Sequence, residues 1–191
     1  MLPIGPLMIE HRLIERMIRL IHEEGTRIRD NVAVSPDFAF VNAKFIDAAV
    51  DFMRTYADQV HHGKEEDILF RALQDKQLTP EHLQMMQELQ ADHQWGRQTT
   101  AELLAAKDKY LRGQAAALEQ VVENLTALAA FYPRHIEKED QNFFLPVMEY
   151  FSQAEKDALL AKMQAFDQEF IHTKYQKVLT DWEASGCKCH L

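Results

Sequence analysis

Apolar side chains recur at helical spacing along almost the whole chain, which predicts helices from end to end. A first helix is predicted over about 6–29, and one of its faces carries the apolar stripe Leu7, Ile14, Ile18 and Ile21. A second helical stretch is predicted over about 37–76, with a distortion near Gly63. Thr79-Pro80-Glu81 combines a capping hydroxyl, a proline suited to a first turn and an acid. It therefore begins a third helix, which ends before Gly113.

Two more helices complete the pattern. A fourth is predicted from about 114 to 150, and Ser152-x-x-Glu155 has the form of a capping box that opens a fifth, extending to 186. Long helices with short connections predict an all-α fold, an antiparallel four-helix bundle with an additional C-terminal helix. We expect residues 1–150 to form the bundle, 151–186 to pack on the same domain, and 187–191 to form a Cys-x-Cys-His tail.

Composition and charge narrow the classes of function. The chain has 191 residues, with 30 acidic and 21 basic side chains and a formal net charge of −9. Such a charge repels a phosphate backbone, so nucleic acid is not an expected partner. No apolar run approaches the roughly 18 residues of a membrane span, and the N-terminus lacks the basic start of a signal peptide. The two cysteines, Cys187 and Cys189, offer no disulfide framework, so we expect a cytoplasmic protein without membrane partners.

One internal repeat carries the candidate chemistry. Residues 61–70 and 135–144 share the pattern H-x-x-K-E-[ED]-x-x-[LF]-F, and Glu10-His11 is echoed by Asp92-His93. The repeat predicts two related helix pairs, in which His11 and His93 occupy equivalent positions.

Histidine and glutamate four residues apart point the same way from a helix. His61 has Glu65 at this spacing and His62 has Glu66, and periodicity does not decide which pair faces inward. The repeat favours His61 and Glu65, because His61 aligns with His135 whereas His62 aligns with Ile136. His62 and Glu66 are then expected in solvent.

The inward groups would be four imidazoles and two carboxylates on four helices. The residues are His11, His61, Glu65, His93, His135 and Glu139. Unpaired polar groups in a core are costly, and a pair of metal ions resolves the cost. Imidazole with carboxylate suits iron or manganese, and zinc is also compatible. Two carboxylates can bridge two metals. With an oxide or hydroxide bridge, each iron would have five ligands and one open position.

These motifs, followed by Phe143-Phe144-Leu145-Pro146, resemble the hemerythrin-like (HHE cation-binding) family of di-iron four-helix bundles. The resemblance spans residues 10–146 and implies two iron ions held by the six residues above. Oxygen-carrying hemerythrins place a fifth histidine where this chain has Arg97, so the two metals should be more alike and simple reversible oxygen carriage is not expected. Asp140 competes with Glu139 for the second carboxylate position, and Glu139 is preferred because it matches Glu65.

Three functions follow from this interpretation. The first is a di-iron protein that binds or reacts with a small oxidant: dioxygen, peroxide or nitric oxide. The second is iron handling or iron and redox sensing without turnover, and the third is a bundle with structural zinc. Whether the protein is an enzyme, which reductant serves it and its oligomeric state stay open.

Weaker candidates surround this set. Glu15 and Tyr132 lie within a turn of predicted ligands, although a surface acid and a core aromatic are the simpler interpretations. Glu169-x-x-His172 has ferritin-type spacing but occurs once, whereas ferritin-like sites need two copies. Cys187, Cys189 and His190 form either a soft-metal tail or a frayed terminus. An apolar sleeve is expected to flank the metals, formed by Ile14, Ile18, Leu69 and Phe143.

Overall fold

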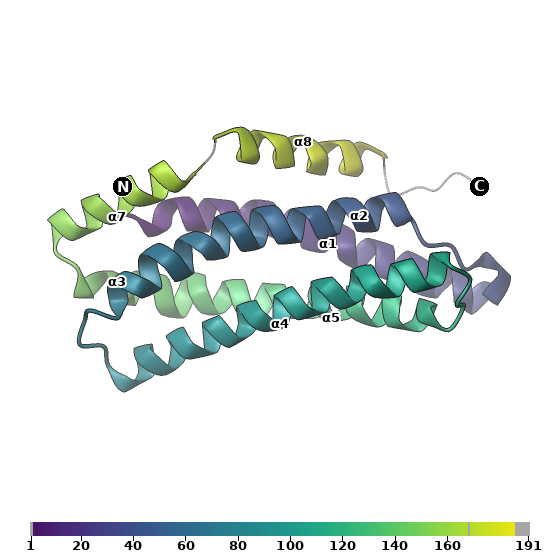
Figure 1. Ribbon diagram of the computed structural model, residues 1–191, viewed down its shortest axis with the longest axis horizontal. Coiled ribbons are helices and arrows are strands. Elements are labelled where there is room, and N and C mark those ends of the chain that lie inside the picture. The colour runs from purple at the N-terminus through teal and green to yellow at the C-terminus, as the bar shows by residue number, and fades with distance from the viewer. Residues whose placement is uncertain (1, 168, 186–191) are drawn as a thin grey trace.

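The computed structural model describes residues 2–167 and 169–185, and over these ranges the chain is helical without a strand. Four antiparallel rods run side by side (Figure 1). The first rod is α1 (Ile4–Val34), followed by the short η1 (Pro36–Phe38), and the third is α4 (Pro80–Leu111). The second comprises α2 (Ala43–Phe52), η2 (Met53–His62), η3 (Glu65–Phe70) and α3 (Arg71–Leu73). The fourth comprises α5 (Ala117–Glu137), η4 (Lys138–Phe143), α6 (Phe144–Val147) and η5 (Met148–Tyr150). The predicted all-α bundle is confirmed.

The predicted helix signals are present at the ends of these rods. Thr79 caps α4 by accepting a hydrogen bond from the His82 amide, and Gly113 ends that helix with a φ of 88°. Ser152 and Glu155 form the predicted capping box of the next helix. The expected distortion at Gly63 extends much further, because Met53–His62 and Glu65–Phe70 are both π-helical.

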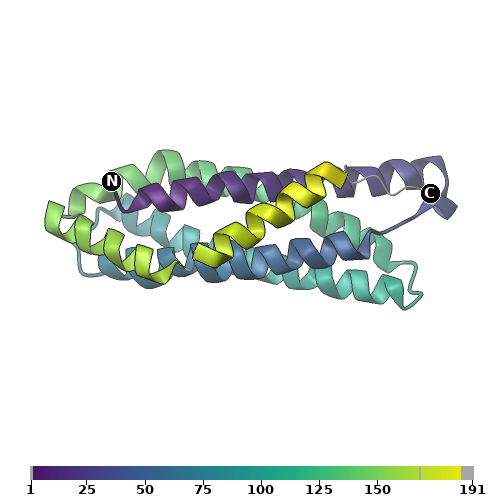
Figure 2. The same ribbon diagram turned by 90° about the horizontal axis from the view of Figure 1, so that it is seen from above.

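The C-terminal segment differs from the prediction. Instead of one helix, it forms α7 (Gln153–Phe166) and α8 (Glu169–Ser185). The chain leaves the helical conformation at Asp167, with φ −67° and ψ 123°, where its carboxylate meets Lys64 of the second rod. In Figure 2, α8 crosses over the first two rods at an angle. Tyr175 of α8 is buried there against the rings of Phe52 and Tyr56.

The core consists of two apolar clusters separated by a polar layer. On α1, Leu7 belongs to one cluster and Ile14 to the other, with His11 between them. The other three rods repeat this order, with one residue of each cluster on either side of a buried histidine or glutamate. The pairs are Ala57 and Leu69 on the second rod, Leu103 and Leu89 on the third, and Ile136 and Phe143 on the fourth. The expected apolar flanks are therefore present as two clusters on opposite sides of the layer. Within the described residues, no helix has the length and apolar character needed to cross a bilayer.

Candidate metal centre

The polar layer brings together all six residues singled out in the sequence, and it adds His62. They come from the four rods: His11 from α1, His61 and His62 from η2, Glu65 from η3, His93 from α4, His135 from α5 and Glu139 from η4. All seven side chains are buried. Their ligand atoms fall into two groups, within each of which the atoms lie no more than 4.8 Å apart: His11, His61, Glu65 and Glu139 in one, and His62, His93 and His135 in the other.

Each glutamate connects the two groups through its two oxygens. Oε1 of Glu65 lies 3.3 Å from Nε2 of His61, and its Oε2 lies 3.3 Å from Nε2 of His93. Oε2 of Glu139 lies 3.1 Å from Nε2 of His11, and its Oε1 lies 3.4 Å from Nε2 of His135. One oxygen toward each group is the arrangement that a pair of carboxylates needs in order to bridge two metal ions.

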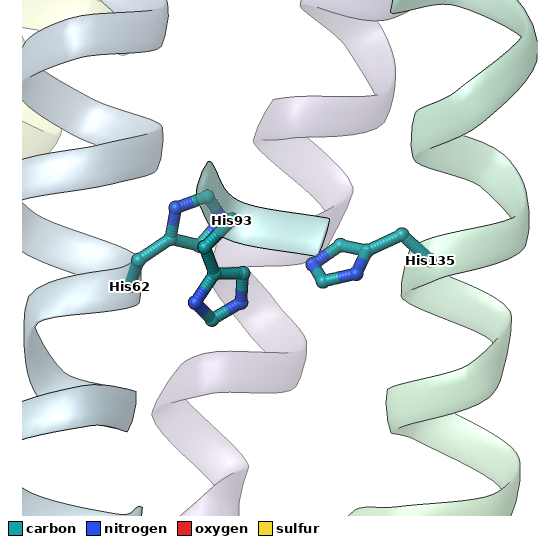
Figure 3. A group of neighbouring side chains, drawn as sticks. All are labelled: His62, His93 and His135. Carbon is teal, nitrogen blue, oxygen red and sulfur yellow. The ribbon is translucent and has the colours of Figure 1, made fainter. Parts of the chain in front are cut away.

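The prediction that His62 lies in solvent is wrong. Its side chain is 2% exposed, its ring stacks on that of His93 with centroids 3.9 Å apart, and it shares a group with His93 and His135 (Figure 3). The reason is the π-helical backbone of η2, whose wider turn lets two consecutive residues, His61 and His62, face the core. The histidine doublet was the signal in the sequence, but the repeat aligns His62 with Ile136 and therefore assigned only His61 to the centre. Glu66 is only partly exposed, and it bonds to His93 rather than pointing into solvent.

A second layer of carboxylates holds every histidine of the centre by Nδ1. The pairs are His11 with Asp140 at 2.7 Å, His61 with Glu10 at 2.9 Å, His62 with Asp58 at 3.3 Å, His93 with Glu66 at 2.7 Å, and His135 with Asp92 at 3.3 Å. An ionised carboxylate can only accept, so Nδ1 donates, and in the neutral imidazole the lone pair of Nε2 faces the centre. Histidines that bind metals are held in this way.

Cationic side chains neutralise these carboxylates in turn. Asp140 is paired with Arg12, Glu10 with Lys64, Asp92 with Lys138, and both Asp58 and Glu66 with Arg97. Arg97 occupies the position at which oxygen-carrying hemerythrins have a fifth histidine. Here it pairs with the two carboxylates that hold His62 and His93. The fifth imidazole is present but comes from another rod, which corrects the expectation that the two halves hold two histidines each. Asp140 belongs to this second layer, whereas Glu139 lies in the centre.

Among the residues that the structure describes, the inner atoms of the layer have no hydrogen-bond partner. They are Nε2 of all five histidines and all four carboxylate oxygens of Glu65 and Glu139, and each is buried. A buried polar group without a partner costs about 1–3 kcal/mol, which a native fold rarely tolerates nine times in one place. Convergent lone pairs and anionic oxygens are the groups that a metal cation satisfies, so the residues present fit a metal pair.

A comparison with family models agrees with this geometry, because the hemerythrin HHE cation-binding domain matches residues 2–147. The chain belongs to the hemerythrin HHE family. No curated protein and no solved structure matches it. The match ends before α7, so the HHE domain corresponds to the four rods and the C-terminal helices lie outside it.

Burial and neighbouring charges shift the pKa values of the buried histidines and glutamates of the HHE domain in opposite directions. Burial alone would lower the pKa of His11, but its contacts with Asp140 and Glu139 raise that pKa to about 9. Burial lowers the pKa of His61 to about 4. Burial and the charge of Glu139 hold the pKa of Glu65 well above its ordinary range, whereas the surrounding imidazoles overcome burial and hold the pKa of Glu139 well below it. Bound cations would favour the ionised form of both carboxylates.

The weaker candidates fall outside the centre of the HHE domain. Glu15 is exposed and pairs with Arg12 at the surface. Tyr132 is buried beside His135, with ring centroids 6.1 Å apart, and lies in neither ligand group. The side chains of Glu169 and His172 and the tail with Cys187, Cys189 and His190 lie outside the described residues.

A small cavity reaches His62, one member of the three-histidine group of the HHE domain. It has a volume of about 260 Å³ and lies between the second and third rods, with Tyr132 of α5 as a further wall. Polar or charged side chains that line it include Asp58, His62, Arg97 and Thr100. A small molecule therefore has a route to the ring of His62.

Proposed function

We propose that this HHE domain holds two iron ions in its polar layer and binds or reacts with a small oxidant: dioxygen, peroxide or nitric oxide. The observation that carries the proposal is the set of nine buried, unpartnered ligand atoms, arranged as two groups that share two glutamates. Five imidazoles and two carboxylates exceed what one ion of ordinary coordination number needs. Two ions are the simplest match.

The donor set favours iron over structural zinc. Imidazole nitrogen with carboxylate oxygen suits iron, and structural zinc sites are usually closed sets of four ligands without shared carboxylates. Here His11 and His61 serve one group and three histidines serve the other, with Glu65 and Glu139 common to both. Neither group is a closed tetrahedral set.

The side chains of the chain hold the metals in defined places. Glu65 and Glu139 carry the negative charge that offsets two dications, and the second layer of carboxylates fixes the tautomer of each imidazole. The two iron ions would supply one-electron redox chemistry and coordination positions for a small molecule. The apolar clusters on both sides of the layer exclude bulk water, so the oxidants that reach it must be small.

One group has two histidines and the other has three, and this difference changes the expectation for dioxygen binding. Arg97 stands where a fifth histidine was expected to be missing, but His62 supplies that imidazole, so the reason to exclude reversible oxygen carriage no longer applies. The site is therefore compatible with both reversible binding and irreversible oxidation. With two shared carboxylates and a solvent bridge, the three-histidine metal would have six ligands and the metal held by His11 and His61 five, so we place the open coordination position on the two-histidine side, with the cavity beside His62 as a route toward the layer. A cytoplasmic location and an unidentified cellular reductant remain part of the proposal.

Metal analysis and absorption spectroscopy test it. Protein from cells grown with iron should hold two irons per chain, and the reduced form should change its spectrum on exposure to air or peroxide. Azide or nitric oxide should then perturb that spectrum. Saturation at one metal, or zinc alone from iron-rich medium, would contradict the di-iron assignment. Two irons with complete inertness toward these molecules would instead support iron handling.

A further inference from the structure

Lys64 is a charged side chain with no exposed surface, and it lies between the ligands His62 and Glu65. Its ammonium group contacts the carboxylates of Glu10 and Asp167. A buried charge is costly in free energy unless it is paired and hydrogen-bonded. The carboxylates of Glu10 and Asp167 therefore make the burial of Lys64 possible. Neither lysine nor partner is a ligand in the centre described above.

These contacts connect the end of α7 to one metal ligand. Glu10 accepts the hydrogen bond from Nδ1 of His61, so a continuous chain of polar contacts runs from Asp167 through Lys64 and Glu10 to His61. Asp167 is the residue at which the C-terminal segment turns from α7 into α8. It lies 20 positions beyond residue 147, where the family match ends.

A second contact joins the same two places. Gly63, the residue before Lys64, lies under the ring of Phe166, the residue before Asp167. A Cβ at Gly63 would come within 3.0 Å of Cζ of Phe166. Two consecutive residues of the C-terminal segment thus meet two consecutive residues of the metal-binding rod. One contact is apolar and the other ionic, which defines both position and orientation.

The carboxylates behind the other four histidines are more exposed than Glu10. These carboxylates, Asp140, Asp58, Glu66 and Asp92, are 15–28% exposed, whereas Glu10 is 2% exposed. Of the five carboxylate–cation pairs in the second layer, the pair at His61 is the buried one. Phe166 and Asp167 lie over it.

We propose that Phe166 and Asp167 form a latch through which the C-terminal helices hold the His61 side of the metal centre in place. Lys64 and Asp167 are positioning residues that act on His61 through Glu10. Displacing the latch loosens the metal held by His11 and His61 and leaves the three-histidine side unchanged. A partner or condition that moves α8 would thereby control retention of one metal of the pair. This inference rests on the proposed di-iron function.

The alternative is that α7 and α8 only stabilise the bundle. In that case, loss of any ion pair between these helices and the bundle should have the same effect on metal retention. Two other ion pairs between the C-terminal helices and the bundle serve as controls. Glu155 of α7 pairs with Lys76 at 2.6 Å, and Glu183 of α8 pairs with Arg16 at 2.5 Å. Glu155→Gln removes a charge and keeps a residue suited to the capping box. Neither control pair reaches the second layer of carboxylates.

The experiment is extraction of iron(II) by an excess of a chelator, under anaerobic conditions, from full-length protein loaded with two equivalents. Asp167→Asn should accelerate the loss of one of the two irons by about tenfold or more, the scale expected when a partner behind a metal ligand is lost. Phe166→Ala should accelerate the same phase. Glu155→Gln and Glu183→Gln should leave both phases unchanged.

A measurement on metal-free protein separates failure of the latch from failure of the proposed function. Hydrogen–deuterium exchange over residues 61–66 should increase in Asp167→Asn and stay at the wild-type level in Glu155→Gln. Unchanged exchange and unchanged extraction in both latch variants would overturn the inference while leaving the di-iron proposal intact. Equal acceleration of both phases in latch and control variants would also overturn it. A wild-type protein that binds no iron but shows the exchange difference would refute the function alone.

Discussion

Glu65 provides a sharp test, because its replacement should move stability in opposite directions with and without metal. Glu65→Gln keeps the shape of the side chain, removes a buried charge and introduces an amide donor. Both carboxylate oxygens of Glu65 are buried without a hydrogen bond, 3.3 Å from Nε2 of His61 and of His93. The amide can donate to one of these nitrogens at any pH, whereas Glu65 can donate only when its carboxyl group is protonated.

The magnitude follows from that one unsatisfied group. Relief of a buried, unpartnered polar group amounts to about 1–3 kcal/mol, so metal-free Glu65→Gln should be more stable than wild type by this amount at a pH above the raised pKa of Glu65, where the wild-type carboxylate is ionised. For a chain of this size, about 1 kcal/mol shifts Tm by about 2–4 °C. A ligand at one hundred times its Kd stabilises by about 2.7 kcal/mol. The variant should lose most of the corresponding rise in Tm on adding iron, because a carboxylate shared by both groups is gone.

Thermal unfolding followed by circular dichroism measures both effects. The protein is stripped with a chelator and then compared with and without two equivalents of iron(II) under anaerobic conditions. Glu23→Gln is the matched control, since Glu23 is exposed on α1 and outside the centre, and the stability of this variant should change by less than about 0.5 kcal/mol. A lower Tm for metal-free Glu65→Gln, or a full iron-induced shift in that variant, would refute the reasoning.

Three further outcomes are expected. His62→Ala should reduce metal content from two ions toward one, while His22→Ala on the exposed face of α1 should leave metal analysis unchanged; equal content in the two variants would contradict a role for His62. Replacing Cys187 and Cys189 together by serine should retain both irons and the spectrum, and loss of one metal would assign the tail to the site. Lys76 and Ser152 lower the pKa of Glu155 to about 2. The ionised Glu155 therefore stabilises the fold at pH values above its ordinary pKa, and this contribution is lost as the pH falls toward 2. Glu155→Gln should flatten that part of the profile of unfolding free energy against pH, measured by urea unfolding.

The helices and six residues of the centre could be predicted from the sequence, because both depend on local spacing. A period near 3.6 residues places apolar side chains on one face, and a histidine four residues before a glutamate shares a face with it. The repeat between residues 61–70 and 135–144 then identified equivalent candidate ligands on different rods. Caps such as Thr79 and Ser152 are local as well, and the structure contains both.

The role of His62 was decided only by the tertiary structure. Its place in the centre depends on the π-helical turn of η2, which shifts the residues of one face and is not encoded in α-helical spacing. Arg97 is similar, since its partners Asp58 and Glu66 lie on another rod. In the sequence Arg97 marks only the absence of a histidine, whereas in the folded chain it pairs with the carboxylates that hold His62 and His93.

The break at Asp167 has the same kind of cause. Nothing between Gln153 and Ser185 resembles a helix-breaking signal, and the spacing predicts one continuous helix. The chain turns there because Asp167 reaches the ammonium group of Lys64 and Phe166 packs on Gly63, about one hundred residues earlier in the chain. Local propensity specifies helices within a few turns, whereas contacts between distant segments determine where a helix must bend, break or turn an additional side chain inward.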